Sequence, residues 1–327
     1  MVLTILFVSL KAMVHAQDIH FSQFFETPLL RNPALAGIYT GDIRVQMVYR
    51  EQWGSVTDGY KTGSLNGEYK LPIGKADDFI TVGGQVLFDR AGTAALTQTS
   101  ILPVVNYHKS LSDDESNRYL SLGFMGGVVN RHFDQSKIIT DDPNGEPTAV
   151  PRYTYLDGSV GLSYNSNLNK KPDDNFYVGI AYHHFTKPKN TFFRDPSVKL
   201  NPKWTGSAGF RFGVAEYAYV SILADYSIQE NYKEAVVGAL YGLKIGPELD
   251  NPKYTIHAGS FIRWDDALIP VVKLDYAPFA FALSYDVNIS KLKPYSNGRG
   301  GFELSVSYIG FLDRDNSSLN AVKCPRF

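Results

Sequence analysis

The chain has 327 residues, of which 44% are hydrophobic, 13% aromatic and 20% charged, enough for one large β domain or two ordinary domains. Its 32 Lys and Arg residues nearly balance 33 Asp and Glu residues, so the chain carries no basic field of the kind that binds nucleic acid. The single Cys excludes a disulfide framework and any multi-cysteine zinc site, and no later apolar run is long enough for a membrane-spanning helix.

Residues 1–16 have the pattern of an export signal. A short apolar run over residues 2–10 is followed by Val14 and Ala16, the small residues that suit a cleavage site. No basic residue precedes the run, and the alternative is an ordinary buried strand. We expect this segment to be removed and the mature chain to lie outside the cytoplasm.

Residues 17–41 carry large apolar side chains before the first predicted strand: Phe21, Phe24, Phe25, Leu29, Leu30 and Leu35. Each gains about 1.5–3 kcal/mol on burial, so we expect the segment to be ordered, as a plug packed inside or beneath the domain that follows. Pro28 and Pro33 exclude one continuous helix and predict short turns, with Asn32 setting the bend. The alternative is a flexible periplasmic arm that orders only on a partner.

From residue 42 to residue 310 the sequence alternates between apolar and polar or small residues. In residues 279–289, for example, large apolar side chains take every odd position, as in a strand with one apolar and one polar face. No helical periodicity interrupts the pattern. About fourteen such segments follow one another, near residues 42–51, 62–71, 79–89, 94–107, 118–130, 153–164, 176–184, 203–212, 217–228, 234–245, 253–264, 267–276, 279–289 and 300–310.

Many alternating strands separated by turns are typical of an outer-membrane barrel, which an even number of strands closes without an edge. At the tight Ala277–Pro278 connection, pairing Tyr276 with Phe279 places Lys273 opposite Ala282, so the polar faces of the two strands meet in one shared interior. The predicted fold is therefore all-β, a transmembrane antiparallel β-barrel of about 14 strands over residues 42–310. One or two soluble β-sandwiches are the alternative.

The longest connections, Arg131 to Arg152 and Phe185 to Pro202, both follow odd-numbered strands. Because bacterial barrels have short periplasmic turns and longer outer loops, we expect both termini to be periplasmic and these two loops to be extracellular, in contact with cargo. A polar linker over residues 313–318 then predicts a periplasmic C-terminal tail, residues 311–327.

Charges of both signs fall on the polar faces of successive predicted strands. A barrel of this size is wider than a filled eight-stranded barrel and narrower than an aqueous porin. Since unpaired buried charges are costly, the mixed signs predict a closed, salt-bridged, non-conducting interior, and the alternative is a narrow selective pore. The predicted lumen set is Arg44, Arg50, Glu68, Gln85, Asp157, Arg211, Asp225, His257, Arg263, Lys273, Asp275, Asp286 and Glu303.

No catalytic or metal-binding signature is present in the sequence. HExxH, a Gly-rich phosphate loop and a GxSxG elbow are all missing. His183 and His184 are expected on opposite faces of one strand, where they cannot bind a metal together. We predict no catalytic residue, no cofactor and no metal site.

Four segments in order resemble the PorP/SprF family of Bacteroidetes outer-membrane proteins, which is associated with type IX secretion and gliding. They are residues 17–37, with His20-Phe21-Ser22-Gln23-Phe24 and Asn32-Pro33-Ala34-Leu35-Ala36-Gly37; the strand end Tyr49-Arg50-Glu51-Gln52-Trp53; residues 285–305, with Tyr285-Asp286-Val287-Asn288 and Gly300-Gly301-Phe302-Glu303; and the ending Cys324-Pro325-Arg326-Phe327. The resemblance spans the mature chain.

The resemblance implies a barrel that helps to secrete large cargo such as gliding adhesins, or to anchor it at the cell surface. The implied partners are the secreted surface protein cargo, a periplasmic lipoprotein or peptidoglycan-linked secretion components, and outer-membrane lipid. The family-like ending implies a docking tail around Cys324, whereas the residues alone favour a mobile tail. The alternative function is an outer-membrane channel or hydrophobic-compound transporter.

Overall fold

The structure is a computed structural model that describes residues 18–52, 59–73, 77–112, 117–137, 150–168, 173–192, 197–247, 252–290 and 299–312. The predicted export signal, Trp53 and the predicted C-terminal motif Cys324, Pro325, Arg326 and Phe327 lie outside the described residues.

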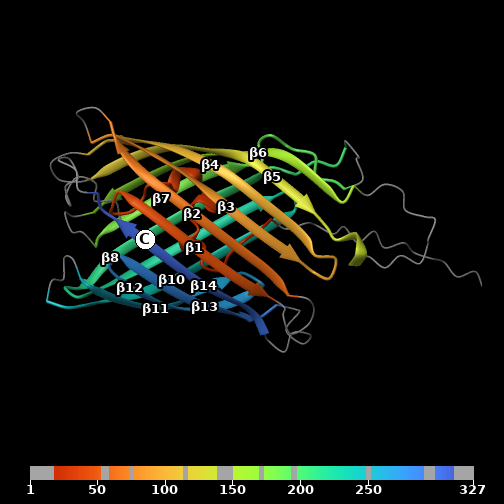
Figure 1. Cartoon of the computed structure of the whole chain (residues 1–327). Helices are drawn as coiled ribbons and strands as arrows, with labels where there is room; N and C mark the ends of the chain where they lie inside the picture. The colour runs from red at the N-terminus through yellow and green to blue at the C-terminus, as the bar shows by residue number, and fades with distance from the viewer. Residues whose placement is uncertain are drawn as a thin grey trace, which may run out of the picture.

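Fourteen antiparallel strands close into one barrel, in which each strand pairs with the next and the last pairs with the first (Figure 1). The strands are β1 (Ile43–Gln52), β2 (Tyr60–Pro72), β3 (Phe79–Ala91), β4 (Leu96–Ser110), β5 (Arg118–His132), β6 (Arg152–Asn167), β7 (Asn175–His183), β8 (Lys203–Ala215), β9 (Ala218–Gln229), β10 (Tyr232–Ile245), β11 (Tyr254–Arg263), β12 (Ala267–Tyr276), β13 (Phe279–Asn288) and β14 (Arg299–Gly310). The predicted 14-stranded antiparallel barrel is confirmed, and the β-sandwich alternative is wrong.

The alternating sequence explains the two faces of the wall. In β1, Arg44 and Arg50 are buried in the interior, whereas Val45 and Met47 between them are exposed on the outside. The β12–β13 register pairs Lys273 with Ala282, as predicted. The outer face carries exposed Val, Leu, Ile, Phe and Tyr side chains along the strands, the composition that a lipid-facing wall requires.

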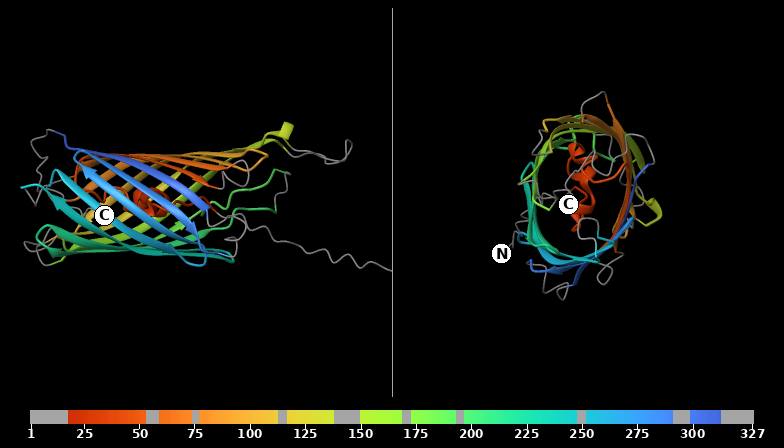
Figure 2. Two further views of the ribbon diagram at one scale, coloured as in Figure 1. Left: turned by 90° about the horizontal axis from the view of Figure 1, so that it is seen from below. Right: turned by 90° about the vertical axis from the view of Figure 1, so that its left-hand side faces the viewer.

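Residues 18–42 lie inside the ring of strands and are named the plug (Figure 2). The plug contains η1 (Phe24–Glu26), α1 (Pro28–Arg31) and η2 (Pro33–Leu35). Pro28 and Pro33 each begin a helical turn, and Asn32 between the turns is extended, as the sequence predicts. No described helix is long and apolar enough to cross a membrane.

The two mouths of the barrel differ. The connections that follow β5 and β7 leave at one end, the long-loop mouth, whereas the two-residue turns that follow β8 and β12 lie at the other, the short-turn mouth. Asp18 contacts His184 and Lys203 at the long-loop mouth, but β14 ends at Gly310 at the short-turn mouth. The sequence analysis predicts that both termini lie on the same, periplasmic side of the membrane. The described chain instead begins and ends at opposite mouths, because the plug runs through the lumen once before β1.

Candidate functional site

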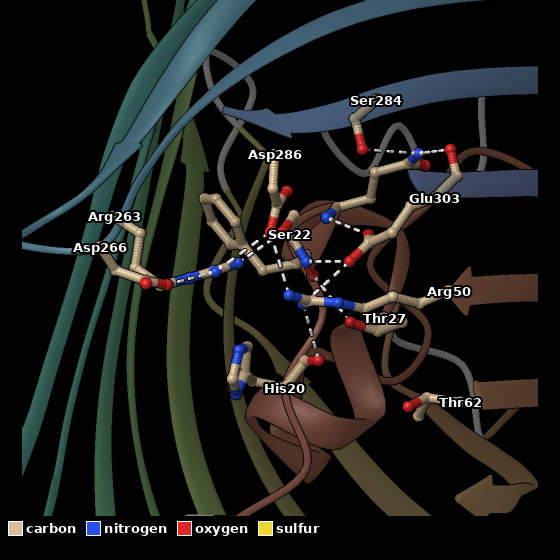
Figure 3. Close-up of polar contacts among 12 residues, drawn as sticks. His20, Ser22, Thr27, Arg50, Thr62, Arg263, Asp266, Ser284, Asp286 and Glu303 are labelled. Atoms are coloured by element: carbon tan, nitrogen blue, oxygen red, sulfur yellow. Dashed lines mark hydrogen bonds and ion pairs between the residues drawn. The ribbon is translucent and has the colours of Figure 1, made fainter. Parts of the chain in front are cut away.

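The start of the plug is held by a buried cluster of charges on β1, β13 and β14 (Figure 3). Glu303 accepts the backbone N–H groups of Ser22 at 2.6 Å and Gln23 at 2.7 Å. Arg50 places Nη1 3.0 Å from Glu303 Oε1 and Nη2 3.0 Å from Asp286 Oδ2. Since barrel closure makes β1 and β14 neighbours, residues far apart in sequence converge on the plug.

The same cluster extends to β11. Arg263 lies 3.2 Å from Asp286 through Nη1 and 2.8 Å from Asp266, and its other terminal nitrogen donates to the Ser22 hydroxyl. The two guanidinium groups of Arg50 and Arg263 therefore share one buried carboxylate. Charges that neutralise one another in this way avoid the penalty of an isolated buried ion.

The plug also supplies charges of its own. Arg31 Nε lies 2.6 Å from Asp225 Oδ2 on β9, and Arg31 Nη2 donates to the Tyr177 hydroxyl at 2.6 Å. On β12, Lys273 Nζ lies 2.6 Å from Glu26 Oε1. The closest ion-pair partners of the wall residues Asp225 and Lys273 therefore belong to the plug.

Asn32 ties the middle of the plug to the opposite wall without any charge. Its Nδ2 donates to the carbonyl oxygens of Leu162 on β6 at 3.2 Å and Ile180 on β7 at 3.3 Å. Its Oδ1 accepts the backbone N–H of Ala34 at 2.8 Å, which caps η2. One amide side chain thus orients the Asn-Pro-Ala turn and attaches it to two strands.

Three glycines, one each on β5, β6 and β7, make room for this turn and are named the glycine socket. A Cβ at Gly123 would lie 2.4 Å from the backbone nitrogen of Ala34, and one at Gly161 would lie 1.9 Å from Asn32 Oδ1. At Gly179 it would lie 2.7 Å from Asn32 Nδ2. The wall must lack side chains here because the plug backbone and the Asn32 side chain occupy their space.

Aromatic side chains fill the lumen between the socket and the charged cluster. Phe24 and Phe25 both contact Phe261 of β11, with ring centroids 5.2 Å and 5.3 Å apart. Leu223 and Leu240 on β9 and β10 belong to the same buried apolar cluster. This part of the plug is held by apolar burial.

The plug ends at the short-turn mouth. Gly37 has φ +82°, where a Cβ would be strained and would also lie 2.0 Å from Thr81 Oγ1. The Gly37 N–H donates to Glu68 Oε2 at 2.7 Å, and Glu68 pairs with Arg44, whose guanidinium lies 4.5 Å from the Tyr39 ring. These contacts set the direction in which the chain enters β1.

At the long-loop mouth, His184 lies between two carboxylates, 3.2 Å from Asp18 and 2.6 Å from Asp157. Its burial lowers the pKa, but Asp18 and Asp157 outweigh this and raise the pKa to about 9. The expectation that His183 and His184 point to opposite faces was wrong. Because β7 ends at His183 and His184 has φ +57°, the alternation stops and both side chains line one cavity.

All of the predicted lumen residues lie on the interior side of the wall. Arg44, Arg50, Glu68, Gln85, Arg211, His257, Arg263, Asp286 and Glu303 are buried, and Asp157, Asp225, Lys273 and Asp275 are partly buried. Arg211 donates to Ser221 and lies 4.4 Å from the Tyr219 ring, whereas Asp275 accepts a hydrogen bond from His257 Nε2 at 3.0 Å. Among the described residues, no group of three His, Cys, Asp or Glu is placed to hold a metal ion.

The predicted motif residues Phe21, Ser22, Gln23, Phe24, Asn32, Pro33 and Gly37 are all buried in the plug. The sequence reasoning missed the plug's charged residues Asp18, Glu26 and Arg31 as partners of the wall. The available signal was that these three charges stand among apolar residues in a segment predicted to be buried.

A closed antiparallel barrel with an apolar outer face, a polar interior and its longest loops at one mouth is an outer-membrane β-barrel, and this one holds an internal plug. The family model described as "Type IX secretion system membrane protein PorP/SprF" matches residues 13–308, and the chain belongs to this family. The predicted family is confirmed, and the ending Cys324-Pro325-Arg326-Phe327 lies beyond the matched residues. The protein is an outer-membrane protein of a secretion-system family, which is not a family of enzymes.

The similarity to individual barrels of known structure is lower than the similarity to the family model. The Ralstonia pickettii toluene transporter TbuX is 10% identical with a TM-score of 0.49, covering 88% of this chain and 94% of that one. A Pseudomonas aeruginosa FadL homologue is 12% identical with a TM-score of 0.45, covering 86% and 94%. CdiB from Acinetobacter baumannii is 10% identical with a TM-score of 0.48, covering 82% of this chain but only 60% of its own. No curated protein matches the sequence.

Proposed function

We propose that this barrel is an outer-membrane component of the type IX secretion system that assists the secretion or cell-surface anchoring of large cargo such as gliding adhesins. Membership of the PorP/SprF family supports the secretion role. The main structural observation behind the proposal is the plug. The lumen of this barrel is occupied by its own chain, which favours a structural role over transport through the lumen.

The plug favours a scaffold over a channel or a hydrophobic-compound transporter. Leu29, Asn32 and Ala34 in its centre are 0% exposed. The plug also supplies the closest ion-pair partners of the wall charges at Asp225 and Lys273, so the charge balance of the wall is built around an occupied lumen. A barrel of this kind is closed and non-conducting, and it acts through its two mouths and its loops.

The rule for bacterial barrels orients the protein: short turns face the periplasm and longer loops face outward. In this orientation the connections over residues 133–151 and 184–202 meet the secreted cargo. The short-turn mouth and the tail, residues 311–327, face a periplasmic lipoprotein or a peptidoglycan-linked component of the secretion machinery. Residues 313–327 of the tail lie outside the described residues.

The test is deletion of the gene, followed by complementation with the full chain carrying an epitope tag near Asn144, a position outside the described residues. Loss of specific proteins from the cell surface, restored by the tagged chain, is the expected result. The tag should bind antibody on intact cells. An unchanged surface proteome contradicts the function, and labelling of lysed cells only contradicts the orientation.

A further inference from the structure

Strand β6 extends beyond its neighbour β7 at the long-loop mouth. Over Arg152–Ser166 it pairs with β5, but it pairs with β7 only over Ser159–Asn167, because β7 ends at His183. Residues 152–158 therefore continue as a strand that has β5 on one side and, among the described residues, no strand on the other.

The even-numbered residues of this extension face the side that β7 leaves open. In an antiparallel sheet each residue directs its backbone N–H and C=O groups to one side, and successive residues alternate between the two sides. The Gly158 carbonyl accepts the N–H of Phe185 at 3.2 Å, and the Leu156 carbonyl accepts the Thr186 hydroxyl at 3.1 Å. These are the last contacts on the β7 side before the chain after β7 turns away.

Beyond Leu156 the side of the strand is open. Arg152 and Thr154 are exposed, and neither has a backbone hydrogen bond on this side with another described residue. The chain after β7 crosses on the lumen side instead: Asn190 accepts a hydrogen bond from Arg131, and both line the cavity inside this mouth. The backbone groups of Arg152 and Thr154, with the Leu156 N–H, are named the β6 edge.

The β6 edge lies where the outer face of the wall stops being apolar. The pair Val128–Leu156 is apolar and exposed, whereas the next pair toward the mouth is polar, and its Asn130 Nδ2 donates to Thr154 Oγ1 at 2.8 Å. Open sheet edges do not occur within the hydrocarbon of a bilayer. The edge is therefore outside the hydrocarbon, where a protein partner can reach it.

The backbone and the side chains of the edge define the chemistry of its partner. A row of free N–H and C=O groups is complementary to another extended backbone. Arg152 is an exposed cation without an ion pair among the described residues, and Leu156 is 67% exposed. Since side chains directly opposite one another on neighbouring strands interact, the partner places an acidic residue beside Arg152 and an apolar residue beside Leu156, four positions apart.

A second copy of this chain does not have that pattern. Antiparallel pairing of two β6 edges about Thr154 sets Arg152 of each copy opposite Leu156 of the other, so neither cation gains a counter-charge. Lys187, which is exposed directly after the Thr186 contact, would add a further positive charge on each side. The pattern fits a different, acidic segment.

We propose that the β6 edge binds a short, extended, acidic segment of the secreted cargo as an added strand. The proposal rests on the proposed function, which turns the long-loop mouth outward, and it names where the cargo is held. The segment pairs with the backbone of Arg152 and Thr154, and its acidic and apolar side chains lie against Arg152 and Leu156.

The test is photo-crosslinking in cells that secrete normally, with p-benzoylphenylalanine, itself apolar, replacing Leu156. The matched control carries the same residue at Trp264, an exposed aromatic position after β11 at the same mouth. We expect an adduct at position 156 with a secreted polypeptide, mapped by mass spectrometry to one stretch with an acidic and an apolar residue four positions apart. That adduct should be missing at position 264.

Removing one donor of the edge should abolish this adduct. Thr154→Pro removes an N–H that has no partner in the barrel, and proline is tolerated at such edge positions, so the yield should fall at least about tenfold. Thr154→Val also removes the hydroxyl but keeps the N–H, and it should retain the adduct. Arg152→Glu, which keeps the backbone, should lower the yield as well, whereas Arg152→Lys should not. Heat-modifiable gel mobility reports folding for each protein.

Three outcomes overturn the proposal: no adduct in cells with intact secretion, an adduct only with the protein's own chain or a second copy of it, or a cargo adduct that both Thr154→Pro and Arg152→Glu leave unchanged. Each of these outcomes leaves the proposed function standing, because that is decided by the surface proteome of the deletion strain.

Discussion

Two parts of the plug are held by different forces. The Asn-Pro-Ala turn is attached to β5–β7 without charge: the glycine socket admits the turn, and Asn32 binds two wall carbonyls. On the ionic side, toward β1, β9 and β11–β14, charged wall residues bind the plug: Glu303, Arg263, Asp225 and Lys273. The socket therefore depends on shape and tolerates no added atom, whereas the ionic side depends on every charge keeping its partner.

The largest expected effect comes from breaking the ionic side. Arg50→Met removes the cation between Glu303 and Asp286. Asp286 keeps Arg263, but Glu303 loses its cation, and breaking a buried pair in this way costs about 3–5 kcal/mol. We expect a lower urea midpoint for unfolding in detergent. Lys109→Met is the matched control, because its pair with Asp78 is on the surface and contributes about 0–1 kcal/mol.

A double-mutant cycle sharpens this prediction. Arg50→Met combined with Glu303→Met removes both members of the pair, so the combined loss should be smaller than the sum of the two single losses. If the two losses of stability simply added, Arg50 and Glu303 would not stabilise each other, and the proposed role of their ion pair would be wrong.

The next largest effect comes from filling the socket. Gly123→Ala places a methyl group 2.4 Å from the plug backbone, and overpacking of this kind costs about 1–3 kcal/mol. We expect trypsin to cut after Arg31 about tenfold faster than in the native protein, and steady single-channel currents should appear in planar bilayers.

The matched control is Gly67→Ala on β2, where a Cβ would meet no atom within 4 Å. It should retain native protection and a closed lumen. Equal cleavage rates in the native protein, Gly123→Ala and a denatured control would show that the plug is not packed in the socket. Large steady currents from the native protein would contradict a closed lumen.

The smallest expected effect is a local response to pH at the long-loop mouth. The pKa of His184 is raised from 6.5 to about 9, so its contribution to stability is fully present below about pH 6.5 and is lost as the pH rises through about 9. The groups that face it are Asp18, Asp157, Lys203 and His183. Only the first residues of the plug should loosen.

Maleimide labelling of Ile19→Cys, in a Cys324→Ser background, measures this loosening. Relative to an exposed control at Lys187→Cys, labelling should rise as the pH passes about 9. His184→Gln cannot carry the charge and should label at the higher level at every pH, whereas His183→Gln should keep the pH dependence. If labelling of the native protein did not change with pH, His184 would not be what holds the first residues of the plug.

Much of the barrel could be predicted because alternation is a local property of strands. Opposite orientation of successive side chains assigns Arg44 and Glu303 to the interior from a few neighbouring residues. His184 shows where this reasoning stops: it failed one residue after the strand ended, where φ becomes positive and the alternation no longer applies.

The sequence by itself therefore determined the class of fold, the family, the inward face of every strand, and the broken, apolar character of the plug. Only the tertiary structure decided which groups meet. Glu303 binds the backbone of Ser22, 281 positions away, and Gly123 is required by the path of Ala34. Such pairings depend on closure of the ring and on the course of the plug from one mouth to the other, and no local pattern encodes either of them.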